Sequence, residues 1–238
     1  MKKLVFAFSC VAVLAAASVG SAALVVTNGD FETGGGENLE NVTDWSDYNT
    51  GNFWEGAWQT NADWISPNGT NVAMFSSFES DDFGTPTNDV NDGSYLYQSF
   101  GTADGAASVD IQFDWGAPND DPGGRELGMT VGIYAYDGST GFTPGDGSDV
   151  RGATGVTMLD SASYTLSSTG VDGLVVTERT TLSLAGAGTQ ELFLRFNGYI
   201  PGTTEAWPML DNVSIVPEPA SVLMCVLGGI AVLAWRRK

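Results

Sequence analysis

The chain has 238 residues, with 29 acidic side chains, nine basic ones and no histidine, for a formal net charge of −20. This charge argues against a nucleic-acid partner, because affinity for nucleic acid comes chiefly from Lys and Arg that neutralise phosphates. The lack of histidine excludes Ser-His and Cys-His catalytic pairs and His-bound zinc. Cys10 and Cys225 lie in apolar segments at the two ends, so the region between them has no disulfide and no cysteine nucleophile.

The first segment, residues 1–23, has the three parts of a signal peptide. It begins with basic residues at Lys2 and Lys3, continues through an apolar run, and closes on small residues up to Ala23. The apolar run is shorter than the roughly 20 residues that a membrane span needs. We therefore expect an N-terminal signal helix, cleavage after Ala23, and export. The alternative is a retained membrane anchor.

The segment 24–216 forms the candidate folded domain. It holds 28 of the acids but only four arginines and no lysine, a net charge of −24. Its length suits one domain with a sizeable core.

Apolar residues in this domain recur with period two, which predicts strands rather than helices. The clearest example is 108–115, where Val109, Ile111, Phe113 and Trp115 fall on one face. The ranges 127–136 and 190–197 alternate in the same way, and weaker strand patterns cover 24–27, 71–76, 94–100, 156–166, 174–184 and 209–216. Gly, Asp, Asn and Pro dominate the connections, as in turns. The pattern indicates an all-β domain, an antiparallel β-sandwich.

Aromatic residues provide the first candidate binding site. Four of the seven tryptophans fall between residues 45 and 64. Trp54 and Trp58 are flanked by Gly and polar residues, so we expect exposed rings that stack on sugars, with Glu55 and Gln59 taking sugar hydroxyls. The alternative is that these rings belong to the core, where tryptophan is mostly buried.

Tyrosines provide a second candidate surface. Tyr95 and Tyr97, like Tyr134 and Tyr136, are spaced to share the outer face of a strand, where they could line a cleft. Tyrosine also favours strands on half-buried surfaces without any ligand.

Two short motifs carry a family resemblance for this domain. The opening Asn28-Gly29-Asp30-Phe31-Glu32, followed by Trp45, and the closing 209–215 (MLDNVSI) resemble the jelly-roll family of carbohydrate-binding modules and galactose-binding-like domains. The resemblance implies a jelly roll whose first and last strands lie close together.

The same resemblance implies one structural calcium, with Glu32 and Asp211 as side-chain ligands. Oxygen donors of this kind suit Ca²⁺. The alternative is that both acids bind backbone groups at strand ends.

Catalysis by paired carboxylates, as in glycoside hydrolysis, finds no specific support. Among 28 acids, which include Asp110, Asp114 and Glu126, no arrangement separates an acid from a base. We expect no enzymatic activity and no catalytic residue. The alternative is a carboxylate-dependent glycan hydrolase or lyase.

The tail, residues 217–238, has three parts: Pro217-Glu218-Pro219, an apolar stretch 220–235, and a basic end with Arg236 and Arg237. As a helix the stretch reaches about 24 Å, close to the hydrocarbon thickness of a membrane, and the basic end favours the cytoplasmic side. The tail resembles the PEP-CTERM sorting signal of Gram-negative bacteria. That resemblance implies an exosortase-type processing enzyme, a C-terminal transmembrane helix before processing, and delivery to the cell envelope or extracellular matrix. The alternative is an ordinary tail anchor.

These observations predict an exported, non-enzymatic envelope or biofilm-matrix protein, displayed in or on extracellular polysaccharide. The first alternative is a specific carbohydrate-binding module that uses Trp54 and Trp58.

Overall fold

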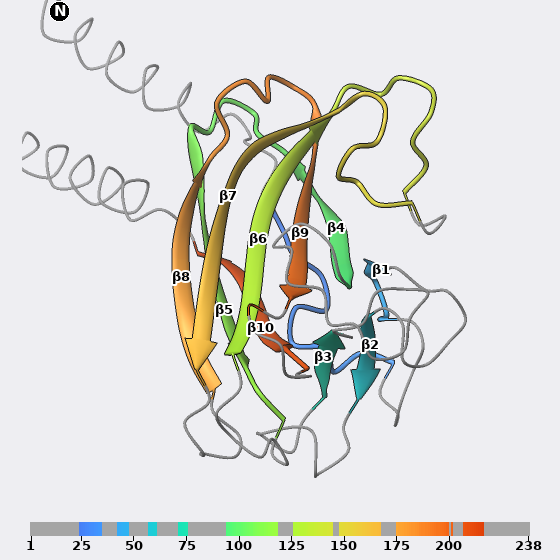
Figure 1. Ribbon diagram of the computed structural model, residues 1–238. Helices are drawn as coiled ribbons and strands as arrows, with labels where there is room; N and C mark the ends of the chain where they lie inside the picture. Colours follow the sequence, from blue (N-terminus) through green and yellow to red (C-terminus); the bar gives the residue numbers. More distant parts are fainter. Residues whose placement is uncertain are drawn as a thin grey trace, which may run out of the picture.

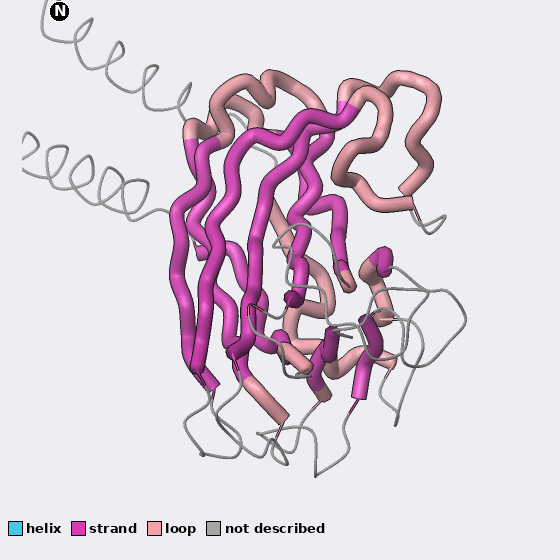
Figure 2. The backbone as a smooth tube through the Cα atoms, in the orientation of Figure 1, coloured by secondary structure: helices cyan, strands magenta, loops and turns pink. Residues whose placement is uncertain are grey.

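The computed structural model describes residues 24–34, 42–47, 57–60, 71–75, 94–118, 126–144, 148–167, 175–199, 201 and 207–216. These residues form ten strands and no helix (Figure 2). The strands are β1 (Ser46–Asp47), β2 (Ala57–Thr60), β3 (Val72–Phe75), β4 (Tyr95–Thr102), β5 (Ser108–Gly116), β6 (Glu126–Tyr136), β7 (Val156–Ser167), β8 (Val175–Ser183), β9 (Glu191–Tyr199) and β10 (Met209–Val216).

The strands form two antiparallel sheets of five strands each, in the orders β1-β4-β9-β6-β7 and β2-β3-β10-β5-β8. In Figure 1 the sheet with β7, β6, β9 and β4 lies in front of the sheet with β8, β5 and β10. The predicted all-β class and antiparallel β-sandwich are therefore confirmed.

The core lies between the sheets and follows the period-two pattern. In β5, Val109, Ile111, Phe113 and Trp115 are buried, and the residues that alternate with them are half-buried. β6 and β9 supply the facing layer, including Val131, Ile133, Leu194 and Phe196. Aligned sheets of this kind bury one face of each strand against the other sheet.

Eight predicted strand ranges coincide closely with β3 to β10, but the prediction for 24–27 is wrong. Among the described residues, this segment makes one backbone bond to the end of β4, from the amide of Val25 to the carbonyl of Phe100. The side chain of Gln98 replaces a second strand: its amide group accepts from the amide of Thr27 and donates to the Thr27 carbonyl. The period-two pattern does not identify the short strands β1 and β2, which have only two and four residues.

The opening and closing motifs meet, as the resemblance implied. The amide of Val213 in β10 donates to the carbonyl of Gly29 at 2.8 Å. A side chain at Gly29 would collide with the Val213 carbonyl, so this close approach requires glycine.

The signal helix (1–23) and the sorting tail (217–238), with Pro217, Glu218, Pro219, Arg236 and Arg237, lie outside the described residues. Within the part that the structure describes, no helix is long and apolar enough to span a membrane.

Candidate functional site

The residues predicted to stack sugars are only partly described. Trp54 and Glu55 lie outside the described residues, and Trp58 is placed on β2 without a described side chain. Gln59 is fully buried, and its side-chain amide nitrogen donates to the carbonyls of Phe31 and Thr33. Gln59 thus ties β2 to the opening motif.

The two predicted calcium ligands take part in separate hydrogen-bonded groups. Glu32 accepts from the backbone and the side-chain amides of Asn71, at 3.0 and 3.2 Å. Asp211 is buried and accepts from the backbone amide and the side chain of Asn212. The pairing of β3 with β10, with Ala73 opposite Leu210, connects the two groups.

The surroundings of Glu32 contain oxygen atoms without hydrogen-bond partners. The side-chain oxygens of Asn71 and Gln59 are buried and have no partner in the structure. Buried polar atoms are normally satisfied, and amide oxygens are common ligands of Ca²⁺. This donor chemistry fits a bound cation. No group of three acidic side chains placed to hold a metal ion occurs among the described residues.

A different surface gathers aromatic, polar and charged side chains. It is the outward face of the sheet β1-β4-β9-β6-β7, which is turned away from the other sheet. Strand register sets its side chains in rows across β4, β9, β6 and β7. One row consists of Tyr97, Arg195, Gly132 and Ser161. The adjacent row consists of Tyr95, Asn197, Thr130 and Ser163.

One end of this face carries a second apolar cluster, separate from the core. We call it the outer aromatic cluster, and it consists of Tyr95, Tyr97, Tyr134, Phe142, Val150 and Phe193. Phe142 and Val150 come from the loop between β6 and β7, which packs on the sheet at this end (Figure 1). Ring pairs such as Phe142 with Phe193, whose centroids lie 5.6 Å apart, are edge-to-face, a favourable geometry.

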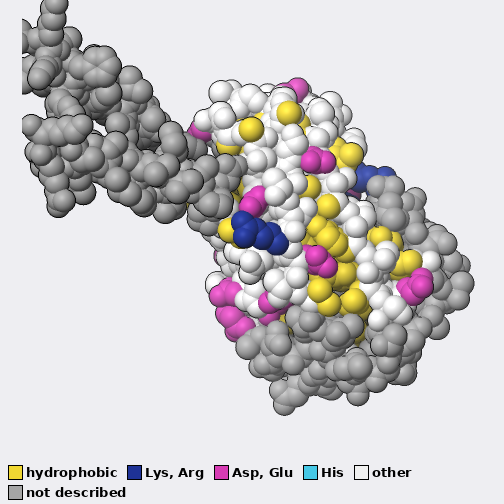
Figure 3. Space-filling model, turned by 90° about the vertical axis from the view of Figure 1, so that its left-hand side faces the viewer, with side chains coloured by type: hydrophobic (Ala, Val, Ile, Leu, Met, Phe, Trp, Pro, Cys, Tyr) yellow, Lys and Arg dark blue, Asp and Glu magenta, His cyan; other side chains and the backbone are white. Residues whose placement is uncertain are grey.

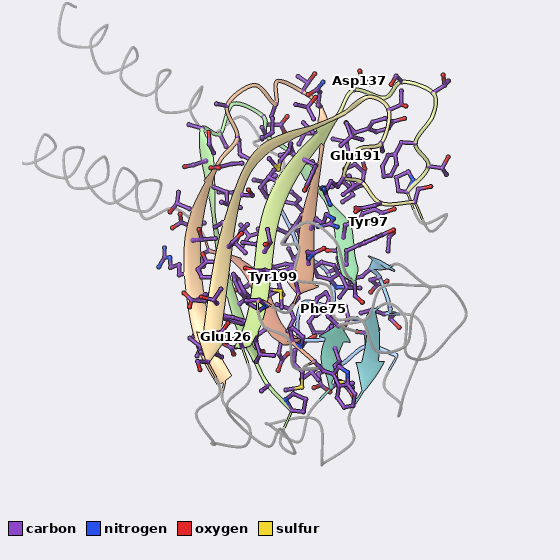
Figure 4. The ribbon with its side chains drawn as sticks, in the orientation of Figure 1. Phe75, Tyr97, Glu126, Asp137, Glu191 and Tyr199 are labelled. Carbon is purple, nitrogen blue, oxygen red and sulfur yellow. The ribbon has the colours of Figure 1, made fainter. Side chains whose placement is uncertain are left out.

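Hydrogen bonds hold the β6–β7 loop onto the sheet. The Tyr97 hydroxyl donates to the carbonyl of Ser148 at 3.0 Å, and the Tyr136 hydroxyl donates to the carbonyls of Ser139 and Phe142. Figure 4 shows Asp137, at the start of this loop, at the same end of the sheet as Glu191. The loop is thus fixed at several points.

A buried ion pair forms the polar centre of this end. Arg195 donates through Nε and one terminal nitrogen to both carboxylate oxygens of Asp149, each at 2.7 Å. The Arg195 side chain is 3% exposed and that of Asp149 is 21% exposed. The guanidinium also lies 4.9 Å from the centre of the Tyr95 ring, a cation–π distance. Burial raises the pKa of the nearby Tyr134 phenol, which keeps its hydroxyl protonated.

The outward side of β6 carries small residues beside the outer aromatic cluster. The Tyr199 ring covers Gly128 and the Tyr134 ring leans over Gly132. Between them Thr130 and Ser163 share a hydroxyl hydrogen bond of 2.9 Å. At 3.3 Å per residue, the four-residue spacing sets the two glycines about 13 Å apart. The face therefore carries a hydroxyl pair between two tyrosine rings (Figure 4 labels Tyr199).

The sequence predicts that the tyrosines lie on this face, but it does not predict that they are buried. Tyr95, Tyr97 and Tyr134 are buried rather than exposed, because the β6–β7 loop covers them. The roles of Arg195 and Asp149 were missed. One available signal was the presence of two large apolar residues, Phe142 and Val150, in a mostly polar, Gly-rich loop.

Of the three carboxylates named for catalysis, Glu126 is exposed at the start of β6, whereas Asp110 and Asp114 are hydrogen-bonded on the outward face of the other sheet. Asp110 accepts from Thr181 and Arg179, and Asp114 accepts from Thr177 and Asn212. The Thr181 hydrogen bond, followed by that from Arg179, lowers the pKa of Asp110.

Comparisons with known proteins leave the family open. No protein-family model matches the sequence, and no curated protein sequence matches it. The K1 cleaved adhesin domain of Lys-gingipain from Porphyromonas gingivalis W83 is 16% identical, with a TM-score of 0.46, over 79% of this chain and 96% of that one. TmCBM61 in complex with beta-1,4-galactotriose is 13% identical, with a TM-score of 0.43, over 83% and 100%. A cyclase from Fischerella sp. TAU is 14% identical, with a TM-score of 0.48, over 83% and 98%. At these values none of the three assigns a fold or a function to this chain.

Proposed function

We propose that this chain is a non-enzymatic carbohydrate-binding protein that binds sugars on the outward face of the sheet β1-β4-β9-β6-β7. The observation that carries the proposal is the composition of that face. A second aromatic cluster outside the core adjoins a row of exposed and half-exposed hydroxyls. The rings are buried under the β6–β7 loop and hold it in place, so a sugar would contact the exposed hydroxyls beside them.

The chemistry of the face matches that of a sugar. Sugars offer many hydroxyls to side chains that both donate and accept, such as Thr130 and Ser163. The net charge of −24 over residues 24–216 would repel an anionic polymer. The ligand class is therefore a neutral polysaccharide.

The Trp54 and Trp58 site, with Glu55 and Gln59, is retained as an alternative location for the same activity. The same binding assay distinguishes the two locations.

The lowered pKa of Asp110 does not suit the general acid of a glycosidase. A glycosidase needs one carboxyl with a raised pKa as general acid, and Asp110 shifts in the opposite direction. The hydrolase or lyase alternative would require two converging acids elsewhere in the chain.

We further propose that the domain is a jelly roll, exported through residues 1–23 and sorted through the PEP-CTERM-like tail to the envelope or extracellular matrix of a Gram-negative bacterium. The strand order supports the jelly roll, because the chain crosses between the two sheets repeatedly from β3 to β6. Comparison of the mass of the secreted chain with that of the full sequence tests both cleavages.

A structural calcium near Glu32 is also a proposal, supported by the unpartnered oxygens of Asn71 and Gln59; Asp211 is the second predicted ligand. A bound calcium ion would join Glu32 of the opening motif to Asn71, which directly precedes β3. At a hundredfold excess over its Kd, calcium would add about 2.7 kcal/mol to the unfolding free energy. We expect calcium to raise the Tm, and Glu32→Gln to remove that rise. An equal Tm in calcium and in chelator would contradict the site.

Carbohydrate binding is tested by native affinity electrophoresis of the full chain through gels that contain neutral or anionic polysaccharides. The acidic protein migrates readily, so a bound polymer slows it. The double variant Thr130→Ala/Ser163→Ala removes the central hydroxyls. At about 1 kcal/mol per hydrogen bond, we expect about tenfold weaker retardation or more.

The matched control is Thr177→Ala/Thr181→Ala, which removes two hydroxyls from the outward face of the other sheet. It should bind like the original chain. Loss of binding in Trp54→Ala/Trp58→Ala alone would move the site to the tryptophans. No retardation by any polysaccharide would overturn the proposed function.

A further inference from the structure

Both ends of the folded domain lie at the same end of the sandwich. Near the start of the domain, the amide of Val25 donates to the carbonyl of Phe100, two residues before β4 ends. At its close, Val216 of β10 lies opposite Asp110, the third residue of β5. A single turn, residues 103–107, joins β4 to β5. The chain therefore enters and leaves the domain beside this turn.

The sequence places the apolar tail very close to this end. Only Pro217, Glu218 and Pro219 separate Val216 from the apolar stretch 220–235, and the four steps from Val216 to Ala220 cover at most about 14 Å. As a helix the stretch reaches about 24 Å, less than the roughly 30 Å of a hydrocarbon core. A short span draws its flanking residues toward the bilayer. Whenever this stretch occupies a membrane, Val216 lies near the lipid headgroups.

The surface beside the chain ends carries little charge. The β4–β5 turn (103–107) lies next to the β8–β9 turn (184–190), since the amide of Leu184 donates to the carbonyl of Ala107. Figure 1 shows both turns at the upper end of the sandwich. Eight of their twelve residues are Ala or Gly, and Asp104 is their one charged residue. Such a surface can approach a bilayer without burying many charges.

Two neighbouring residues add to this character. Val25, which adjoins the β4–β5 turn through its bond to Phe100, is 52% exposed although it is apolar. Asp110, opposite Val216, is paired with Arg179 at 2.6 Å, so its charge is partly neutralised. We call the two turns together with Val25 the junction surface.

We propose that the junction surface rests on the lipid bilayer that holds the apolar tail. Charge favours this end of the domain, because the net charge of −24 over residues 24–216 would be repelled by anionic headgroups. The strands β4, β5, β8 and β9 begin or end at the two turns, so they rise away from the membrane. This inference rests on the proposed membrane tail and not on carbohydrate binding.

The same orientation places the far end of the domain well away from the lipid. β7 begins at the membrane end, because Val156 is opposite Tyr136, which is opposite Glu191 at the start of β9. β7 ends at Ser167, which is exposed. At 3.3 Å per residue, the two ends of β7 are about 36 Å apart. The outward face of the sheet β1-β4-β9-β6-β7 then opens sideways, parallel to the membrane normal, where polysaccharide can reach it.

The test is quenching of single fluorescent labels by a lipid with a nitroxide on its headgroup, in phosphatidylcholine vesicles. The full chain in a Cys10→Ala/Cys225→Ala background is labelled at Ala185→Cys, in the β8–β9 turn. Matched labels go at Ser167→Cys, at the far end, and at Ser163→Cys, on the outward face. All three positions are exposed. Because such quenching requires near contact, we expect it to be several-fold stronger at Ala185→Cys than at either control.

Flotation of the vesicles separates the two possible failures. A chain that does not float with the vesicles would refute the membrane tail and this inference with it. A chain that floats but is quenched equally at the three positions, or most strongly at Ser167→Cys or Ser163→Cys, would overturn the orientation alone. Circular dichroism verifies that each labelled variant is folded.

Discussion

At the residue scale, Gly198 shows how closely the two sheets approach. A Cβ there would lie 2.5 Å from the Cβ of Phe75 on β3, which is fixed to its backbone and cannot swing aside. Gly198→Ala should therefore lower the unfolding free energy by about 1–3 kcal/mol, as overpacking does. Urea unfolding measures the change.

Gly132→Ala is the control for this prediction. Its Cβ would lie 3.0 Å from the edge of the Tyr134 ring and 3.6 Å from the Cβ of Ser161, which is an ordinary contact, so only the ring has to shift. Its effect on stability should be small, since a strand also gains from the replacement of glycine. Equal losses in the two variants would contradict the packing described for Gly198.

The hydrogen bonds of Asp110 should affect how the unfolding free energy of the protein changes at low pH. Because its pKa in the folded state lies below the ordinary value of 3.8, its contribution to stability is present above that value and is lost as the pH falls through the lowered pKa. Asp110→Asn should reduce stability at neutral pH and flatten the loss below about pH 4. Urea unfolding across this pH range measures both changes.

Thr181→Val removes the hydrogen bond that lowers the pKa of Asp110 most and keeps the carboxylate. Its profile should lie between those of the original chain and Asp110→Asn. Identical acid profiles in all three proteins would refute this account of Asp110.

At the element scale, the β6–β7 loop depends on the sheet beneath it. Asp149 anchors it to Arg195 through two hydrogen bonds, and Arg151, two residues on, is exposed. Asp149→Asn breaks a charge-assisted pair with a buried guanidinium. The loop should open more often, and trypsin should cut after Arg151 about tenfold faster.

Asp137→Asn is the matched control, because Asp137 lies in the same loop but its carboxylate bonds only to Ser139 in the described residues. It should leave the cleavage rate unchanged. A rate in Asp149→Asn equal to that of the original chain would show that the ion pair does not hold the loop.

Strands with one clean apolar face were predictable from the sequence, and elements set by long-range contacts were not. The alternation in β5 identified its core residues, since a strand buries every second side chain. Residues 24–27 have the composition of a strand, but the side chain of Gln98 takes the place of a pairing partner. The burial of Arg195 could not be predicted, because it depends on Asp149, 46 residues earlier in the chain.

The candidate site was predictable only in part for the same reason. The outward direction of Tyr95 and Tyr97 followed from period two. Their burial depends on the loop between β6 and β7, which packs over them. The local sequence pattern around the tyrosines contains no information about that packing. Glu32 and Asp211 were placed near the meeting of the two motifs, but the roles of Asn71 and Gln59 depend on strand pairing that the sequence does not encode locally.

At the scale of the whole molecule, charge decides which polymers can reach the outward face. The net charge of −24 over residues 24–216 would repel anionic polymers and would also oppose self-association. Figure 3 shows acidic side chains spread over one side of the molecule.

The central claim is that sugars bind the outward face of the sheet β1-β4-β9-β6-β7. Hydrogen–deuterium exchange of the full chain, with and without a polysaccharide that retards it in gels, tests the claim directly. The account predicts slower exchange in β6, in β7 and in the loop between them, with β5 and β8 unchanged. Protection confined to residues 53–64, or to β5 and β8, would contradict it.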